Sequence, residues 1–149
     1  MNLVSGNEVL GLMEKVRSEH GAYRLLLLCA PFISSKLLLH VAGFGRHVPV
    51  LTTVLTIPKT AQELLAVNLS GPFRIASIPG FHAKVYIACG KDDRDSVAII
   101  GSFNLTHFGL NRNYELGVQI SGTDSNERSL IKGAEQTLKR ILLRKGAIQ

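Results

Sequence analysis

The order of apolar strands and amphipathic helices along the 149-residue chain constrains its fold more than any other feature. In the first half, predicted strands at 23–30 and 48–56 alternate with helices at 5–21, 34–43 and 60–69. The second half holds four short strand candidates, at 73–78, 83–89, 96–102 and 115–120, and a final helix from about 124 to 145. This order predicts a single α/β domain, residues 1–149, in which helices flank both faces of a mixed, mostly buried β-sheet.

Capping signals and apolar spacing refine the predicted helices. Ser5 and Glu8 form a capping box at the start of the first helix, and Thr60 with Glu63 repeats the pattern. Helical spacing places four apolar residues of the first helix on one face: Val9, Leu12, Met13 and Val16. It also predicts six inward-facing residues on the final helix: Leu130, Ile131, Ala134, Leu138, Ile141 and Leu142.

The composition favours a folded protein outside the membrane. Apolar residues make up 46% of the chain, which indicates a core rather than disorder. The longest apolar run, LLLLCAPFI, is too short to cross a bilayer. The N-terminal MNLVSGNEVLGLMEK lacks the basic start and apolar middle of a signal peptide. We therefore expect a cytoplasmic protein with no stable membrane association.

The two cysteines, Cys29 and Cys89, lie inside apolar segments, which favours buried free thiols over a disulfide or a metal pair. The chain contains no C-x-x-C or H-E-x-x-H spacing, so the sequence predicts no protein-built metal site and no cofactor. The polar GKDDRDS segment between two strand candidates indicates a solvated hairpin turn without a chemical role.

Positive charge is concentrated in the final helix. The formal net charge is +6, and residues 128–145 hold six basic side chains against one acid, Glu135. A basic surface is typical of a protein that binds a polyanion such as nucleic acid or an anionic membrane. Basic residues near a helix C-terminus also complement the helix dipole, so the sequence leaves both explanations open.

Unusual polar residues stand beside the strand candidates of the second half. His82 and Lys84 are two residues apart, so on a strand they would share one face. Such a pair is costly to bury without an anion, and phosphate is the natural one. Ser102 and Asn104 follow the next strand and could reach the same place, and Glu115 could accept a hydrogen bond from a histidine nitrogen. Together the residues fit phosphoryl transfer.

Each of these residues also has a structural interpretation. His82 and Lys84 could be an edge-strand pair with solvated heads. Asn104 could be a turn residue, and Glu115 a surface partner of Arg112. Each explanation is plausible for its own residue. The occurrence of all these residues together, in this order, favours a catalytic role.

The segments HAK, GSFN and LTHFGLNRNYELG, spread in this order over residues 82 to 117, resemble the phospholipase D superfamily, and in particular its metal-independent endonucleases. The resemblance implies that His82 is the nucleophile that forms a phosphohistidine or, in a partner copy, the general acid. It implies that Lys84 and Asn104 hold the non-bridging phosphate oxygens, that Ser102 helps to position the phosphate, and that Glu115 orients His82.

The chain departs from the superfamily pattern in two respects. Cys89 stands where the family has an Asp, a residue that is mostly structural there. The family's active site uses two His-Lys-Asn sets, whereas this chain holds one. Four histidines have no lysine two residues on: His20, His40, His47 and His107. The resemblance therefore implies a homodimer with the active site at its symmetric interface.

Three functions fit these observations. The first is a metal-independent nuclease that hydrolyses DNA or RNA through a phosphohistidine, the second a phospholipid hydrolase, and the third a catalytically silent nucleic-acid-binding module. The positive charge and the spacing of Glu115 favour the nuclease. His107 is a candidate helper, and three residues of the same loop could touch the substrate: Asn111, Arg112 and Asn113.

Overall fold

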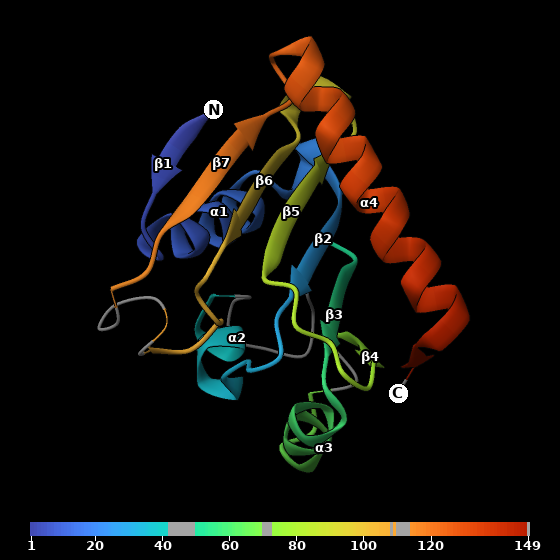
Figure 1. The fold of residues 1–149 in the computed structure, drawn as a ribbon. Helices are drawn as coiled ribbons and strands as arrows, with labels where there is room; N and C mark the ends of the chain where they lie inside the picture. Colours follow the sequence, from blue (N-terminus) through green and yellow to red (C-terminus); the bar gives the residue numbers. More distant parts are fainter. Residues whose placement is uncertain (42–49, 70–72, 108, 110–113, 149) are drawn as a thin grey trace.

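A mixed sheet of eight strands runs through the part of the chain that the computed structural model describes, residues 1–41, 50–69, 73–107, 109 and 114–148 (Figure 1). In chain order the strands are β1 (Asn2–Val4), β2 (Tyr23–Cys29), β3 (Thr52–Thr56), β4 (Arg74–Ser77), β5 (Val85–Gly90), β6 (Val97–Gly101), β7 (Gly117–Ser121) and β8 (Ala147–Ile148). Their order in space is β1-β7-β6-β5-β2-β3-β4-β8. β2, β3 and β4 are parallel, and the other neighbouring pairs are antiparallel.

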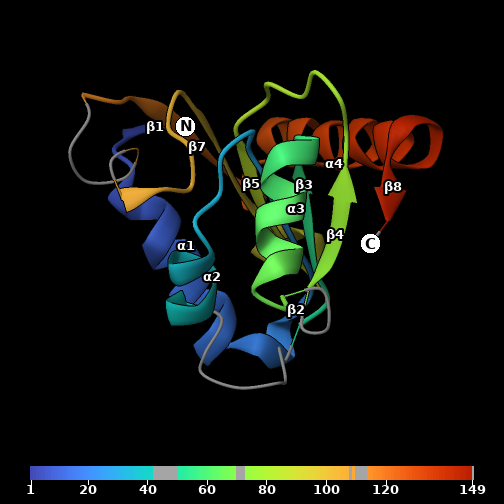
Figure 2. The same ribbon diagram turned by 90° about the horizontal axis from the view of Figure 1, so that it is seen from below.

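Helices cover both faces of this sheet, as Figure 2 shows. One face carries α1 (Asn7–Ser18), α2 (Ser35–Val41) and α3 (Pro58–Ala66). The other face carries α4 (Ser125–Lys145), which runs diagonally across the strands (Figure 1). The predicted α/β fold with a mixed sheet between helices is confirmed.

Apolar side chains on the two faces form separate cores. The first contains the predicted face of α1 packed with residues of β2 and β6: Val9, Leu12, Met13, Val16, Leu26, Leu28 and Ile99. The second joins α4 to residues of β2 and β5 on the opposite side of the sheet: Ile131, Leu138, Leu25, Leu27 and Ile87. Cys29 and Cys89 belong to this second core and are buried free thiols, as predicted. Burial raises the pKa of both, to about 12 for Cys89, so neither is a reactive thiolate near neutral pH.

The first predicted capping box is only half formed, because the N-cap of α1 is Gly6 and no side chain caps a backbone N–H there, and the second is wrong. The Glu8 carboxylate accepts hydrogen bonds from Ser5 N at 3.0 Å and Ser5 Oγ at 2.8 Å. Thr60, by contrast, lies buried inside α3, and its Oγ1 donates to the carbonyl of Pro31 at 2.6 Å. Pro58 occupies the first turn of α3, so the helix begins two residues earlier than predicted because proline pre-sets the backbone angle there.

The final helix is confirmed, with one error in its inward face. Asp124 caps it by accepting hydrogen bonds from two backbone N–H groups at 2.9 Å each. Leu130 was predicted to face inward but is 56% exposed. Glu135 is buried instead, since its carboxylate pairs with Arg24 at 2.8 and 2.9 Å and with Lys139 at 2.7 Å. These ion pairs compensate for the desolvation of the carboxylate.

The short edge strands β1 and β8 were not predicted, whereas the polar hairpin between β5 and β6 is confirmed. It contains a short 3₁₀ turn, η2 (Asp93–Asp95), in which Asp92 accepts a hydrogen bond from Arg94 N. Within the described residues, none of the helices has the length and apolar character that crossing a bilayer requires.

Candidate active site

Three strand ends meet at one edge of the sheet, where β5, β6 and β7 have their lower ends in Figure 1. β6 is antiparallel to both β5 and β7, so the start of β5, the end of β6 and the start of β7 lie side by side. The five predicted site residues all lie within three positions of these ends: His82, Lys84, Ser102, Asn104 and Glu115. The sheet register therefore gathers segments that are up to 33 residues apart in the chain.

His82 and Lys84 lie immediately before β5, which begins at Val85 rather than at the predicted Ala83. The Lys84 carbonyl accepts a hydrogen bond from Gly101 N at 3.2 Å, which holds this segment against the end of β6. The His82 side chain is exposed and that of Lys84 is half-buried. Among the described residues, the His82 side chain has no hydrogen-bond or ion-pair partner, so its ring faces solvent.

The glycines of this edge make room for one aromatic ring. Phe103 is fully buried, and a Cβ at Gly101 would lie 2.8 Å from its ring. Gly117, which pairs with Gly101 across the ladder, would meet the same ring at 2.7 Å. Tyr86 on β5 stacks on Phe103 with ring centroids 6.2 Å apart. Both positions require glycine because the Phe103 ring packs directly against their backbone. This packing fixes the place where the chain leaves β6.

Tyr86 also anchors the turn after β6 by a hydrogen bond. Its hydroxyl donates to the carbonyl of Phe103 at 2.8 Å. Burial is the main cause of its raised pKa, with the Glu115 carboxylate a lesser cause, so the phenol stays a neutral donor. The sequence analysis did not identify Tyr86, although its one polar atom in an apolar strand is a usable signal.

Ser102 connects the end of β6 to the start of β7. Its backbone N–H donates to the Leu116 carbonyl at 3.1 Å, and its Oγ accepts from Leu116 N at 3.2 Å. The Ser102 hydroxyl donates to the Glu115 carboxylate. Glu115 is therefore held beside Ser102, and no hydrogen bond between described residues joins it to His82 of the same chain.

Asn104 is held against the segment that follows β2. Its Oδ1 accepts a hydrogen bond from Phe32 N at 3.4 Å, which leaves the amide nitrogen available as a donor. The next residue, Leu105, forms a parallel bridge with Ile33, and its carbonyl accepts from Ser34 N at 2.8 Å. The end of β2 is thus a fourth segment at this edge, one that the sequence analysis did not include.

The other residues suggested by the sequence are His107 and three loop residues. His107 is exposed and lies three residues beyond Asn104. Asn111, Arg112 and Asn113 lie outside the described residues, and with them the suggested Glu115–Arg112 pair. No group of three or more His, Cys, Asp or Glu side chains in the described ranges is arranged to hold a metal ion.

Cys89, which replaces the superfamily's Asp, lies away from this edge. It is four residues along β5 from Val85, a distance of about 13 Å in a strand. It is fully buried on the α4 face and lies beside Glu135, whose carboxylate contributes to the raised pKa of the thiol. The departure from the motif therefore changes the core and not the edge where His82 lies.

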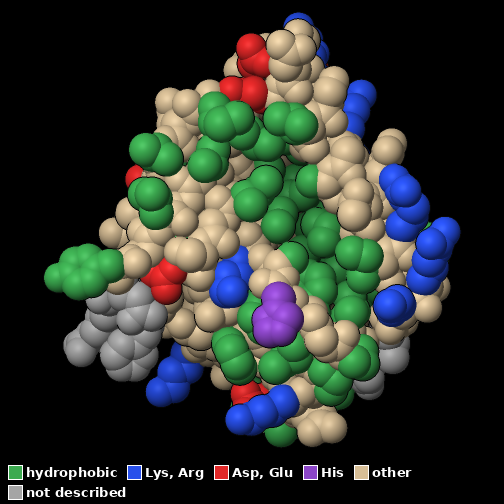
Figure 3. All heavy atoms as spheres, viewed as in Figure 1, with side chains coloured by type: hydrophobic (Ala, Val, Ile, Leu, Met, Phe, Trp, Pro, Cys, Tyr) green, Lys and Arg blue, Asp and Glu red, His purple; other side chains and the backbone are tan. Residues whose placement is uncertain are grey.

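An apolar row begins at this edge on the α4 face. Register pairs place four side chains side by side across four strands: Leu3, Val118, Ile100 and Val85. Leu3 is 73% exposed and Ile100 is 44% exposed, while Val118 and Val85 are half-buried. Figure 3 shows hydrophobic side chains as a continuous band on this face beside α4. We call these four residues the apolar row.

The family profile described as cardiolipin synthase, PLD-like domain, matches residues 36–141. No curated protein matches the chain in sequence.

Solved structures share its fold. NucT from Helicobacter pylori superposes with a TM-score of 0.71 at 12% identity, over 97% of this chain and 96% of that chain. The phospholipase D family member Nuc from Salmonella typhimurium gives 0.58 at 14% identity, over 96% and 89%. TrmBL2, an archaeal chromatin protein that binds DNA, gives 0.55 at 15% identity, over 93% and 52%.

Proposed function

Because this chain belongs to the family of phospholipase D-like domains, we propose that it is a phosphodiesterase, and specifically a metal-independent nuclease that acts on DNA or RNA. The observation that supports this most strongly is the gathering of polar residues from separate segments at one sheet edge: His82, Lys84, Ser102, Asn104 and Glu115. The net charge of +6 favours a polyanionic substrate. The shared fold with DNA-binding TrmBL2 is consistent with it.

His82 is the proposed nucleophile. Its ring nitrogen forms a bond to phosphorus while the bond from phosphorus to the leaving oxygen breaks, which gives a phosphohistidine. Water then attacks that phosphorus, the N–P bond breaks, and the histidine is restored. An exposed ring without a partner among the described residues of its own chain is suited to this role, since no hydrogen bond to them must break first.

Lys84 and Asn104 are the proposed phosphate ligands. A lysine ammonium supplies a compact positive charge, and the Asn104 amide nitrogen supplies a neutral donor. Asn104 is oriented for this because its carbonyl oxygen is bound to Phe32 N. Both groups would stabilise the negative charge that spreads over the non-bridging oxygens in the transition state.

A second copy of the chain would complete the reaction. In-line displacement puts the attacking and leaving groups on opposite sides of phosphorus, so one histidine cannot both attack and protonate the leaving oxygen. The His82 of a second copy would donate that proton and later accept one from water. Glu115, whose carboxylate accepts a hydrogen bond from Ser102, is the residue proposed to orient the histidine ring of the second copy.

The apolar row is the surface that suits this second copy. It starts at Val85, the residue after Lys84, and runs across β6 and β7 to β1 without a charged side chain. Burying exposed apolar area stabilises association by about 25 cal/mol per Å² before the cost of association is counted. A two-fold contact over this row would bring the two His82 segments to the same interface.

The decisive experiment is cleavage of single- and double-stranded DNA and RNA in excess EDTA by wild type and by His82→Ala. We expect wild type to cut and the variant to lose about 10³-fold or more of the rate, because the nucleophile is gone. His82 is exposed, so its replacement leaves the fold intact, which thermal unfolding verifies.

Two results would contradict the nuclease assignment. Nucleic-acid binding without cleavage by clean wild-type protein would indicate the silent binding module. Turnover of phospholipid vesicles, with nucleic acid left intact, would indicate the lipid hydrolase.

A further inference from the structure

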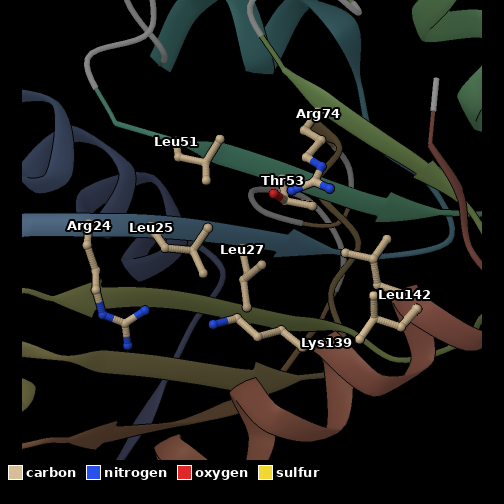
Figure 4. Close-up of a pocket in the computed structure, with 9 residues that line it drawn as sticks. Arg24, Leu25, Leu27, Leu51, Thr53, Arg74, Lys139 and Leu142 are labelled. Carbon is tan, nitrogen blue, oxygen red and sulfur yellow. The ribbon is translucent and has the colours of Figure 1, made fainter.

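A groove between α4 and the parallel strands lies outside the site described above. It has a volume of about 370 Å³, which is in the range of ligand-binding pockets. Its lining comes from β2, β3, β4 and α4 and from Leu51, the residue before β3. Figure 4 shows leucine side chains between Arg24 and Lys139 on one side and Arg74 on the other. We call this the α4 groove.

The charges of the α4 groove come from three different elements. Arg24 and Lys139 both bind the carboxylate of Glu135, so two cations share one anion. Arg74 is exposed and makes no ion pair with any residue in the described part of the chain. The groove thus carries an excess of positive charge that its own residues do not neutralise.

The helix dipole explains only part of this charge. Cations in the last turn of a helix complement its dipole, which accounts for Arg144 and Lys145. It does not account for Arg74 or Arg24, which lie on strands and face the same groove. From Gln136 to Lys145 the helix contains no acid, so the positive field extends along its outer side as well. Lysine and arginine side chains line this part of α4 in Figure 3.

The floor and rim of the groove are apolar and partly open to solvent. Leu25 and Leu27 are buried at its base, whereas Leu51 is 56% exposed and Leu143 is 85% exposed. An occupant that matches this groove carries anionic groups spaced along a chain and flat apolar faces between them. A single-stranded polynucleotide has both, because its phosphates are charged and its base faces are not stacked inside a duplex.

We propose that the α4 groove binds a single-stranded stretch of the polynucleotide substrate, away from the scissile bond. Phosphates contact Arg74 and Lys139, and base faces cover the exposed leucines. The inference rests on the proposed function only in that the polynucleotide is the substrate. The groove contributes affinity for the substrate and a preference for single strands, and it takes no part in the reaction itself.

The test compares oligonucleotide binding by Arg74→Glu and Arg74→Gln, each made in His82→Ala protein so that no strand is cut. We expect Arg74→Glu to weaken binding of a labelled single-stranded 20-mer roughly tenfold, and Arg74→Gln to weaken it less. Losing one phosphate contact should also lower the slope of log affinity against log salt by about 0.7 for a single strand. Fluorescence anisotropy at several salt concentrations measures both.

Arg17→Glu is the matched control, because Arg17 is an exposed arginine on α1, on the opposite face of the sheet. It should change affinity less than either Arg74 variant. Equal losses of affinity in the Arg17 and Arg74 variants, or no loss in the Arg74 variants, would contradict the proposal that the groove binds the strand. Equal losses for duplex and single strand would overturn the assignment of base faces to the leucines.

Failure of this inference is separable from failure of the proposed function. Hydrolysis of the small diester bis(p-nitrophenyl) phosphate by wild type needs the sheet edge and not the groove. Absent turnover counts against the nuclease, whereas unchanged oligonucleotide affinity in Arg74→Glu counts against the groove alone.

Discussion

On the face of the sheet that α1, α2 and α3 cover, the side chains of the central strands are buried in one core, whereas the α4 face is covered by a single helix. A helix is about 10–12 Å wide and strands are about 4.8 Å apart, so one helix covers two or three strands of a sheet. α4 therefore leaves two areas open, the apolar row on one side and the α4 groove on the other.

The two open areas differ in charge, and the difference indicates different occupants. The four side chains of the apolar row are uncharged and begin beside His82, which suits a second copy of the chain. The α4 groove is lined by three cations, two of which share the Glu135 carboxylate, and this excess of positive charge suits a polyanion. On the face that α1, α2 and α3 cover, Tyr86 and Phe103, which shape the turn after β6, belong to the core.

The largest effect on the α4 face is expected from Glu135→Gln. Arg24 and Lys139 lower the pKa of this buried carboxyl from its ordinary 4.5 to about 2, mainly through the Arg24 hydrogen bonds. At about 1.4 kcal/mol per pH unit this would be about 3 kcal/mol, and solvent screening at the partly exposed Arg24 and Lys139 reduces it to about 2 kcal/mol. We expect Glu135→Gln to lose about that much at pH 7 in urea unfolding.

The pH dependence gives the sign of this effect. A carboxyl with a lowered folded-state pKa stabilises the fold above its unfolded value and loses that contribution as the pH falls through the folded value. The difference between wild type and Glu135→Gln should therefore shrink between about pH 4.5 and pH 2. Glu14→Gln, at an exposed position on α1, is the control. A difference that stays constant through this range would refute the explanation.

On the face that α1, α2 and α3 cover, Gly101→Ala should have the next largest effect on stability. The new Cβ would lie 2.8 Å from the Phe103 ring and 3.0 Å from the Gly117 Cα, so the turn or the ring must move. Overpacking of this kind costs about 1–3 kcal/mol, and displacement of Ser102 should also slow turnover. Urea unfolding measures the first and diester hydrolysis the second.

Gly133→Ala is the matched control for that substitution. A Cβ at Gly133 meets no atom within 4 Å, and the residue lies inside α4. The change should stabilise the protein by up to about 1 kcal/mol, since alanine favours helix over glycine. If both substitutions destabilised equally, close approach at Gly101 would not be the cause.

Much of the fold could be predicted from the sequence because the apolar pattern of neighbouring residues indicates each strand or helix. The face of α1 and the hairpin at residues 92–95 depend on neighbours in the chain, and both were predicted correctly. Leu130 was wrongly placed on the inward face. The burial of Glu135 was not predicted, because apolar spacing cannot show that Arg24, more than 100 residues away, supplies a partner for a buried acid. The second capping box failed because Thr60 bonds to Pro31, which is distant in sequence.

The candidate site was predictable as a set of residues but not as an arrangement. The motif spacing identified His82 and Asn104, and the register of three strands places their segments at one edge. The contact of Asn104 with Phe32 could not be inferred, since it depends on where β2 ends in the sheet. The bond between Ser102 and Glu115 was not foreseen either, because Glu115 was assigned to the histidine.

The smallest expected effect is on association, through Ile100→Asp in the apolar row. A carboxylate there would lose its hydration in a dimer without gaining a partner, which should raise the dimer dissociation constant at least tenfold, or about 1.4 kcal/mol. Ile100 is 44% exposed, so the monomer should keep most of its stability. Sedimentation at several protein concentrations measures the change.

Leu130→Asp is the control, because Leu130 is also an exposed apolar residue, 56% accessible, but lies on α4 outside the row. If two copies build the site, diester turnover per chain in Ile100→Asp should fall as the protein is diluted, while Leu130→Asp follows wild type. Turnover that is independent of concentration in a protein shown to be monomeric would mean that one chain suffices. The apolar row would then need another occupant, and the proton for the leaving oxygen would have to come from within the chain.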